Sequence, residues 1–221
     1  MSRIIDLTLP IADHFCWKME RRLVADHAHG SQFQVTWAGW SVHGFTHVDA
    51  PCHLLAEGIT TSNFNLDQLI GRAAVIDLTS LKPNEPITVA RISAAADHVA
   101  VGDIALLKTC WELRHPPTSP AFWRTSPWLT REACDWLRTR GIKALGVDFP
   151  QDEGIRHLLD GIVKPITDYP SHDALLRHGV LLVEYLCNLV ALTRPHTQLY
   201  VLPLKIPDAD GAPVRAIAIE E

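Results

Sequence analysis

Short apolar runs recur along the whole chain, and glycine, proline, aspartate or asparagine bounds each of them. Runs of this length and composition are typical of β-strands. The pattern predicts strands over residues 4–9, 34–42, 73–78, 104–108, 143–147, 180–184, 199–205 and 214–219. Because predicted helices separate several of these strands, we expect a mixed α/β domain with a sheet or barrel-like core.

Three segments between the predicted strands carry the signals of helix starts and ends. The predicted helices span residues 88–96, 130–140 and 171–178. They begin at hydroxyl residues that are favourable N-caps, namely Thr88, Thr130 and Ser171. Gly141 and Gly179 follow the second and third helices and are expected to end them. The proline-rich segment 116–127 is predicted to be a surface loop that serves as a lid or a subunit contact.

The composition is that of an ordinary globular protein, and it narrows the possible functions. Because the chain has 221 residues, 47% hydrophobic and 20% charged, we expect residues 1–221 to form one domain. A net charge of −5 without a basic patch argues against nucleic-acid binding. No apolar stretch predicts a membrane span or a signal peptide. Scattered cysteines without a C-x-x-C pair argue against disulfides and thiolate zinc sites, so we expect a cytoplasmic protein.

The strongest chemical signal is a cluster of four potential metal ligands at odd-numbered positions. These residues are His43, His47, Asp49 and His53. An extended chain directs every second side chain to the same face, whereas a helix would direct Asp49 away from the histidines. A straight strand would spread the four residues over roughly 33 Å, so the chain must bend if they share one site. Gly44 and Pro51 are suitable bending points.

The cluster offers imidazole and carboxylate groups without a thiolate, a combination that suits Zn²⁺, Mn²⁺ or Fe²⁺. Three such ligands and one open position form a hydrolytic site, because the metal lowers the pKa of bound water to about 7. Asp49 has two carboxylate oxygens and can bridge two metals. The alternative interpretation is a polar strand end, with Asp49 capping a turn before Pro51.

Such a site is usually completed from elsewhere in the chain, and His172 and Glu184 are the best candidates. Glu184 interrupts an apolar run, where a metal would remove the high cost of burying an unpaired carboxylate. The alternative places Glu184 at a solvated sheet rim. Asp148 ends another apolar run, and we expect it to cap or form a turn. Trp17 lies in an irregular polar stretch and is a candidate for the wall of a substrate pocket.

The motif resembles the H-x-G-T-H-x-D-x-P-x-H signature of the metal-dependent cyclase family, which includes bacterial kynurenine formamidase and isatin hydrolase. The matching residues are His43, Thr46, His47, Asp49, Pro51 and His53. Segments 106–112, 147–150 and 171–189 resemble further blocks of the family, so the resemblance covers most of the chain. It implies a swivelling β/β/α fold in a single domain with a mixed, barrel-like sheet, assembled as a homodimer or higher homo-oligomer.

The resemblance also implies a site and its cofactor. It implies one or two divalent metal ions, Zn or Mn, and a small-molecule substrate. The implied metal ligands are His43, His47, Asp49, His172 and Glu184. His53 is implied to be the catalytic general acid/base, which shuttles a proton during attack on an amide or lactam carbonyl.

Two departures from the family pattern concern the substrate. Phe45 replaces the glycine of the signature and brings a bulky ring beside the ligands, which makes it a second candidate for substrate contact. Residues 13–18 stand where formamidases have a Pro/Gly-rich loop. We predict hydrolysis of an amide-type C–N bond in a formamide, lactam or related cyclic amide. The alternatives are a lyase or dehydrating cyclase on the same site, or an inactive metal-binding protein.

Overall fold

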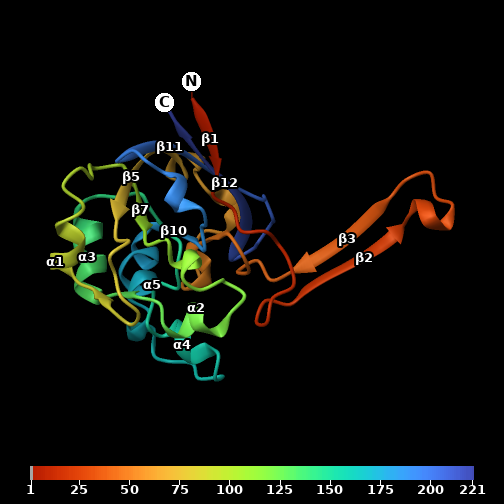
Figure 1. Cartoon of the computed structure of the whole chain (residues 1–221). Helices are drawn as coiled ribbons and strands as arrows, with labels where there is room; N and C mark the ends of the chain where they lie inside the picture. Colours follow the sequence, from red (N-terminus) through yellow and green to blue (C-terminus); the bar gives the residue numbers. More distant parts are fainter. Residues whose placement is uncertain (1) are drawn as a thin grey trace.

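One mixed sheet closes on itself to form a barrel, shown in Figure 1. The computed structural model describes residues 2–221. The strands are β1 (Arg3–Asp6), β2 (Met19–Ala25), β3 (Val35–Trp40), β4 (His47–Asp49), β5 (Ile70–Asp77), β6 (Pro86–Ile87), β7 (Ile104–Lys108), β8 (Trp128–Leu129), β9 (Ala144–Val147), β10 (Leu181–Glu184), β11 (His196–Pro203) and β12 (Gly211–Glu220). The strand order is β1-β12-β11-β5-β7-β9-β10-β4. Strand β4 also pairs with β12, and this pairing closes the barrel and leaves β1 outside the ring.

The middle of this sheet is parallel and buried. Strands β5, β7, β9 and β10 run parallel to one another, and Ile76, Leu107, Leu145 and Val183 are inaccessible or nearly so. Parallel strands that are covered on both faces have continuous apolar sequences. This burial explains why apolar runs in the sequence predicted these strands. Each of the eight predicted strands overlaps a strand of the structure. The predicted mixed α/β fold with a barrel-like sheet is confirmed.

Short helices connect the strands and cover the sheet. They are α1 (Val89–Ser93), α2 (Pro120–Arg124), α3 (Arg131–Thr139), α4 (Ile155–Leu158) and α5 (Pro170–Ala174). Figure 1 shows α1 and α3 side by side at one edge of the barrel. The predicted starts at Thr88 and Thr130 are confirmed, because both side chains accept a backbone N–H of the first turn. Among residues 2–221, no helix has the length and apolar character needed to cross a membrane.

Two local predictions were wrong. Segment 116–127 contains α2, and its Phe122 and Trp123 are buried in the core rather than exposed on a loop. Pro120 occupies the first turn of α2, where a missing N–H costs nothing, so the prolines do not exclude a helix. Ser171 is not an N-cap, because α5 begins at Pro170 and the Ser171 hydroxyl donates to Asp152 inside the protein.

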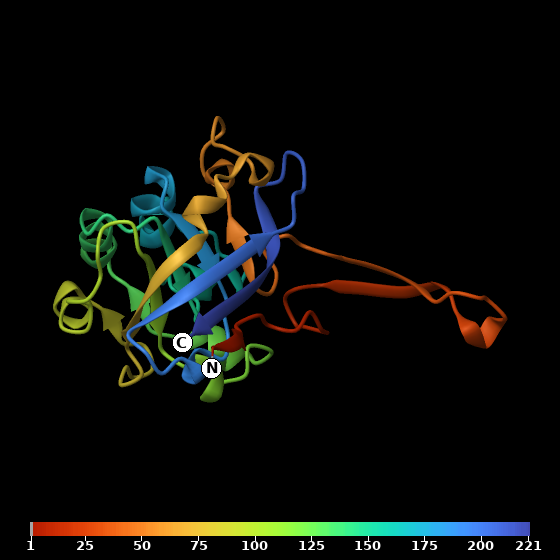
Figure 2. The ribbon, with the colours of Figure 1, turned by 90° about the horizontal axis from the view of Figure 1, so that it is seen from above.

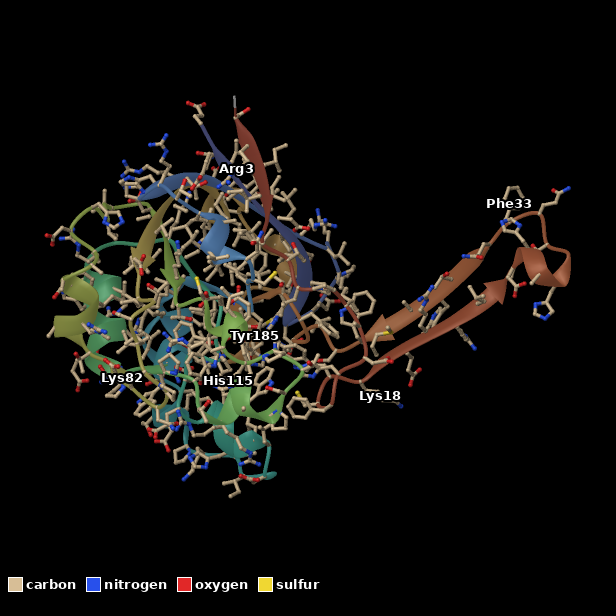
Figure 3. All side chains as sticks on the ribbon, viewed as in Figure 1. Arg3, Lys18, Phe33, Lys82, His115 and Tyr185 are labelled. Atoms are coloured by element: carbon tan, nitrogen blue, oxygen red, sulfur yellow. The ribbon has the colours of Figure 1, made fainter. Side chains whose placement is uncertain are left out.

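A two-stranded hairpin, residues 19–40, leaves the barrel as an arm (Figures 1 and 2). Its strands β2 and β3 pair only with each other among the described residues. Figure 3 shows Lys18 at the base of the arm and Phe33 near its far end. The sequence predicted β3 but not β2, which carries a charged, largely exposed sequence. Trp17 precedes the arm and His43 follows it, so both ends of the arm join the candidate site.

Candidate metal centre

The motif around His47 is bent at both ends, as the predicted bending points required. Only β4, from His47 to Asp49, is a strand; a turn precedes it, and the 3₁₀-helix η2 (Pro51–His53) follows it. Phe45 adopts a left-handed conformation with φ of 62°, at the position where the family signature has glycine. A residue other than glycine in this backbone conformation raises the free energy of the folded chain by about 1 kcal/mol, a cost that glycine would avoid.

Sheet closure brings the two distant segments of the site together. Strand β4 lies antiparallel to β10, and His47 pairs directly with Glu184. On its other side β4 pairs with β12, where Gly211 faces His43 so closely that a Cβ atom would lie 2.8 Å from the imidazole. The ring closure at β4 therefore supplies one wall of the centre and leaves room for the His43 ring.

Three imidazoles converge on two buried carboxylates. Asp49 Oδ1 lies 2.8 Å from His43 Nδ1 and 3.2 Å from His47 Nε2, and its Oδ2 lies 3.4 Å from His172 Nε2. Glu184 adds oxygens 3.7 Å from His47 Nε2 and 3.6 Å from His172 Nε2. All five residues implied as ligands therefore meet at one centre.

An acceptor outside the centre holds the second nitrogen of each imidazole. His43 contacts Asp210 at 3.0 Å, His47 donates to the Phe45 carbonyl at 2.9 Å, and His172 contacts Asp152 at 2.6 Å. Such outer acceptors fix the tautomer and orientation of histidines that bind metals. The inner nitrogen of each ring is thereby directed at the carboxylates.

Two buried atoms of the centre have no hydrogen-bond partner among the described residues. These are Nε2 of His47 and Oδ2 of Asp49, and both residues are only 1% exposed. An unsatisfied buried polar atom costs about 1–3 kcal/mol unless a partner compensates it. Potential ligand atoms of His47, Asp49 and Glu184 lie within 4.8 Å of one another, as do those of His43, Asp49 and His53. The donors and their spacing fit a divalent cation.

The imidazoles and carboxylates of the centre shift the pKa values of one another. Burial opposes the charged form of His43, but Asp49 and Asp210 raise its pKa to about 9. Burial also works to raise the pKa of Asp49, yet the close approach of the histidine rings, His172 foremost, holds that pKa well below its usual range. Burial and the charge of Asp49 raise the pKa of Glu184. Because a cation competes with protons for the same nitrogens, its binding must release protons.

His53, predicted as the acid/base, lies at the outer side of the centre. Its ring is tilted against His43 with centroids 4.0 Å apart, and its side chain is 36% exposed. Its Nδ1 lies 3.4 Å from Asp210 Oδ2. The position gives His53 access both to the centre and to the adjoining cavity.

A cavity of about 500 Å³ opens onto the metal centre. Trp17 lines it, as the sequence suggested for a pocket wall. Phe45 is not among the lining residues: it is buried, and its ring packs against Trp17 with centroids 5.0 Å apart. Trp17 also contacts Trp123 and Tyr185, which line the cavity, and Figure 3 marks Tyr185 within the body of the barrel. The Phe45 ring therefore supports the cavity wall from behind.

Sequence reasoning missed the residues that hold the ligands in place. Asp152 accepts the backbone N–H of Ser171 and contacts His172, and Gln151 donates to Glu184. Asp148, in contrast, has the capping role that was expected, because it accepts the backbone N–H groups of residues 109 and 110. The only signal for Asp152 was its place after an apolar strand. Asp210 lies in a turn-like D-A-D-G sequence that carries no metal signal.

This chain is similar to known proteins in its sequence. A family model described as "Putative cyclase" matches residues 5–153. Kynurenine formamidase of Salinibacter ruber is 30% identical over 188 residues (80% of this chain, 76% of the relative), and that of Erythrobacter litoralis is 29% identical over 206 residues (92% and 82%).

Solved structures extend the comparison to the fold. Isatin hydrolase A from Ralstonia solanacearum superposes with a TM-score of 0.84 at 22% identity, covering 100% of this chain and 92% of the other. An isatin hydrolase bound to the product analogue thioisatinate gives 0.80 at 25% identity, covering 99% and 92%. Together the relatives support hydrolysis of an amide-type C–N bond in a small molecule, with a divalent metal. The chain belongs to the cyclase family, whose model matches most of its length.

Proposed function

We propose that this chain is a metal-dependent hydrolase that adds water across an amide-type C–N bond of a formamide, a lactam or a related cyclic amide. The observation that carries the proposal is the convergence of three oriented imidazoles on Asp49 and Glu184, with unsatisfied buried atoms between them. The similarity to kynurenine formamidases and isatin hydrolases supports the type of bond.

Five side chains would hold the metal: His43, His47, Asp49, His172 and Glu184. A bound divalent cation lowers the pKa of water and polarises a carbonyl. His53 accepts the proton of the attacking water and returns it to the leaving nitrogen, so that the bond yields a carboxylate and an amine. Asp210 holds Nδ1 of His53, which keeps Nε2 available as the base.

Zinc or manganese suits the mixture of imidazole and carboxylate ligands. Asp49 belongs to both groups of clustered donors, one with His43 and His53 and one with His47 and Glu184. If two ions bind, Asp49 would be the residue that both groups share. Elemental analysis of the purified protein would give the identity and number of the ions.

We also propose a homodimer, supported by the arm. An isolated two-stranded hairpin is marginally stable in water, and this arm exposes Leu23, Val24, Phe33 and Trp37. Packing against a second copy would cover these side chains. The free thiols among the described residues suit a reducing compartment, so we place the enzyme in the cytoplasm.

Metal analysis combined with activity tests the proposal. His47→Ala should lose bound metal and the hydrolysis of formanilides and isatin, because it removes a buried inner nitrogen. His178→Ala, an exposed histidine away from the centre, should keep both. Mass spectrometry of the product should show the gain of one water; loss of water would instead indicate a dehydrating lyase. A His47→Ala protein that retains metal and turnover would refute the proposal.

A further inference from the structure

We propose that the cavity selects substrates whose group beyond the amide is neutral and apolar, and discriminates against substrates that carry a carboxylate or an amino acid there. This inference rests on the hydrolase function proposed above and adds its substrate class. It follows from what surrounds the cavity outside the metal centre.

Aromatic side chains form one part of the cavity wall. Trp17, Trp123 and Tyr185 contact one another, with ring centroids 5.0 Å apart for the two Trp17 pairs and 5.1 Å for Trp123 and Tyr185. Trp123 and Tyr185 are buried, and the N–H group of Trp123 is occupied by the Pro117 carbonyl at 2.9 Å. This part of the wall therefore presents mainly carbon to a ligand and favours planar apolar groups.

Aliphatic side chains form another part. They come from α4, from the residue that follows it, from η6 (Ile166–Asp168) and from the residue after η2: Ile155, Leu158, Leu159, Ile166 and Leu54. Leu158 is 47% exposed and Ile166 is 37% exposed. A ligand that covers these two side chains removes apolar surface from water, which favours binding.

The charged groups of the cavity all belong to the metal centre. The carboxylates that line it are Asp49 and Glu184, and among the described residues no lysine or arginine lines it. The arginine of α4, Arg156, is engaged elsewhere: it stacks over Trp128 and donates to the Ser126 carbonyl at 3.1 Å. A substrate carboxylate placed beyond the amide would lose its hydration next to apolar walls, without a lysine or arginine side chain to compensate it.

A matched pair of substrates isolates this effect. Formanilide and 4-formamidobenzoate have the same scissile bond and the same ring, and differ by one carboxylate. For the metal-loaded protein, kcat/KM for formanilide should exceed that for 4-formamidobenzoate by about 10-fold to 100-fold. N-formylkynurenine, a formamide that carries an amino acid, should be disfavoured in the same direction.

A variant at the half-exposed Leu158 tests the cause. Leu158→Arg places a cation at the cavity and should raise kcat/KM for 4-formamidobenzoate relative to formanilide by about tenfold. Leu158→Gln is the matched control, because it adds polarity without charge and should change the ratio much less than Leu158→Arg does. Because Leu158 is partly exposed, both variants are expected to fold.

Binding of the products gives a readout that does not depend on turnover. Quenching of tryptophan fluorescence in the metal-free protein should show tighter binding of aniline than of 4-aminobenzoate, because Trp17 and Trp123 line the cavity. Equal or faster hydrolysis of the two charged substrates would overturn the inference and leave the hydrolase intact. Absence of turnover on every substrate, with the metal bound, would instead overturn the proposed function.

Discussion

The metal centre and the arm are built in opposite ways from the same chain. At the centre, residues from five distant segments meet in a buried space, and outer acceptors hold each imidazole. In the arm, two neighbouring strands pair only with each other within residues 2–221, and several of their apolar side chains are exposed. Contacts within the chain thus hold the site of the barrel in place, whereas the arm needs contacts with another molecule. Local stability should differ accordingly between the two regions.

The arm and the centre are nevertheless joined. The chain passes from Trp17 at the cavity into β2, returns through β3, and enters the turn that carries His43. A partner that orders the arm would therefore also restrain one wall of the cavity and one proposed ligand. The comparison predicts large effects for changes at the centre and small ones for changes along the arm.

The largest effect is expected from Asp49→Asn. Asp49 is contacted by all three convergent imidazoles, and the amide removes the charge while keeping the shape. Metal affinity and kcat/KM should fall by more than about 100-fold, beyond the usual effect of losing an outer partner of a metal ligand. Elemental analysis and steady-state kinetics measure both quantities. Unchanged metal content would remove Asp49 from the ligand set.

A smaller effect is expected from the outer acceptors. Asp152→Asn should weaken metal binding by about 10-fold to 100-fold, because the completely buried Asp152 side chain holds His172. Asp210→Asn should weaken it less, since the Asp210 side chain is 49% exposed and water can replace it. Competition with a chelator measures the two affinities. Equal losses, or none, would contradict the positioning role assigned to these carboxylates.

The sequence located the parts of the molecule whose chemistry is local. Buried parallel strands such as β7 and β9 are continuous apolar runs, and the spacing of the four potential ligands in segment 43–53 favours an extended chain over an α-helix. The unusual place of Glu184 in an apolar run made it a candidate, and the family resemblance gave it and His172 the role of ligands. No spacing rule connects these two residues to the motif.

The features that the sequence did not reveal depend on closure of the sheet and on the position of each residue within its element. Pairing of β4 with both β10 and β12 brings Asp210 beside His43 and His53, and a turn aspartate carries no trace of that pairing. Strand β2 was missed because an exposed ribbon has no buried face to produce an apolar pattern. The prolines of segment 116–127 predict a loop, but Pro120 lies in the first turn of α2, where a missing N–H does not oppose a helix.

The pH dependence of metal binding should reflect the raised pKa of His43. A protonated imidazole cannot coordinate a metal. Metal affinity should therefore rise by at least about tenfold per pH unit below about pH 9 and level off above that pH. In Asp210→Asn the plateau should begin at a lower pH, because Asp210 contributes to raising that pKa. Metal titrations between neutral and alkaline pH measure the curve. An affinity that is independent of pH would contradict His43 as a ligand.

The smallest effect is expected on the arm, and it decides whether the arm needs a partner. Leu23→Ser replaces a side chain that is 49% exposed on β2 and should weaken a homodimer by about 1 kcal/mol, roughly fivefold in Kd. Val101→Ser is the matched control, because Val101 is 84% exposed on the barrel and far from the arm in sequence. Sedimentation at several concentrations separates the two. If Leu23→Ser and Val101→Ser behave alike, or if the unmodified chain is monomeric throughout, a second copy does not cover the arm, and its exposed apolar side chains require a different partner.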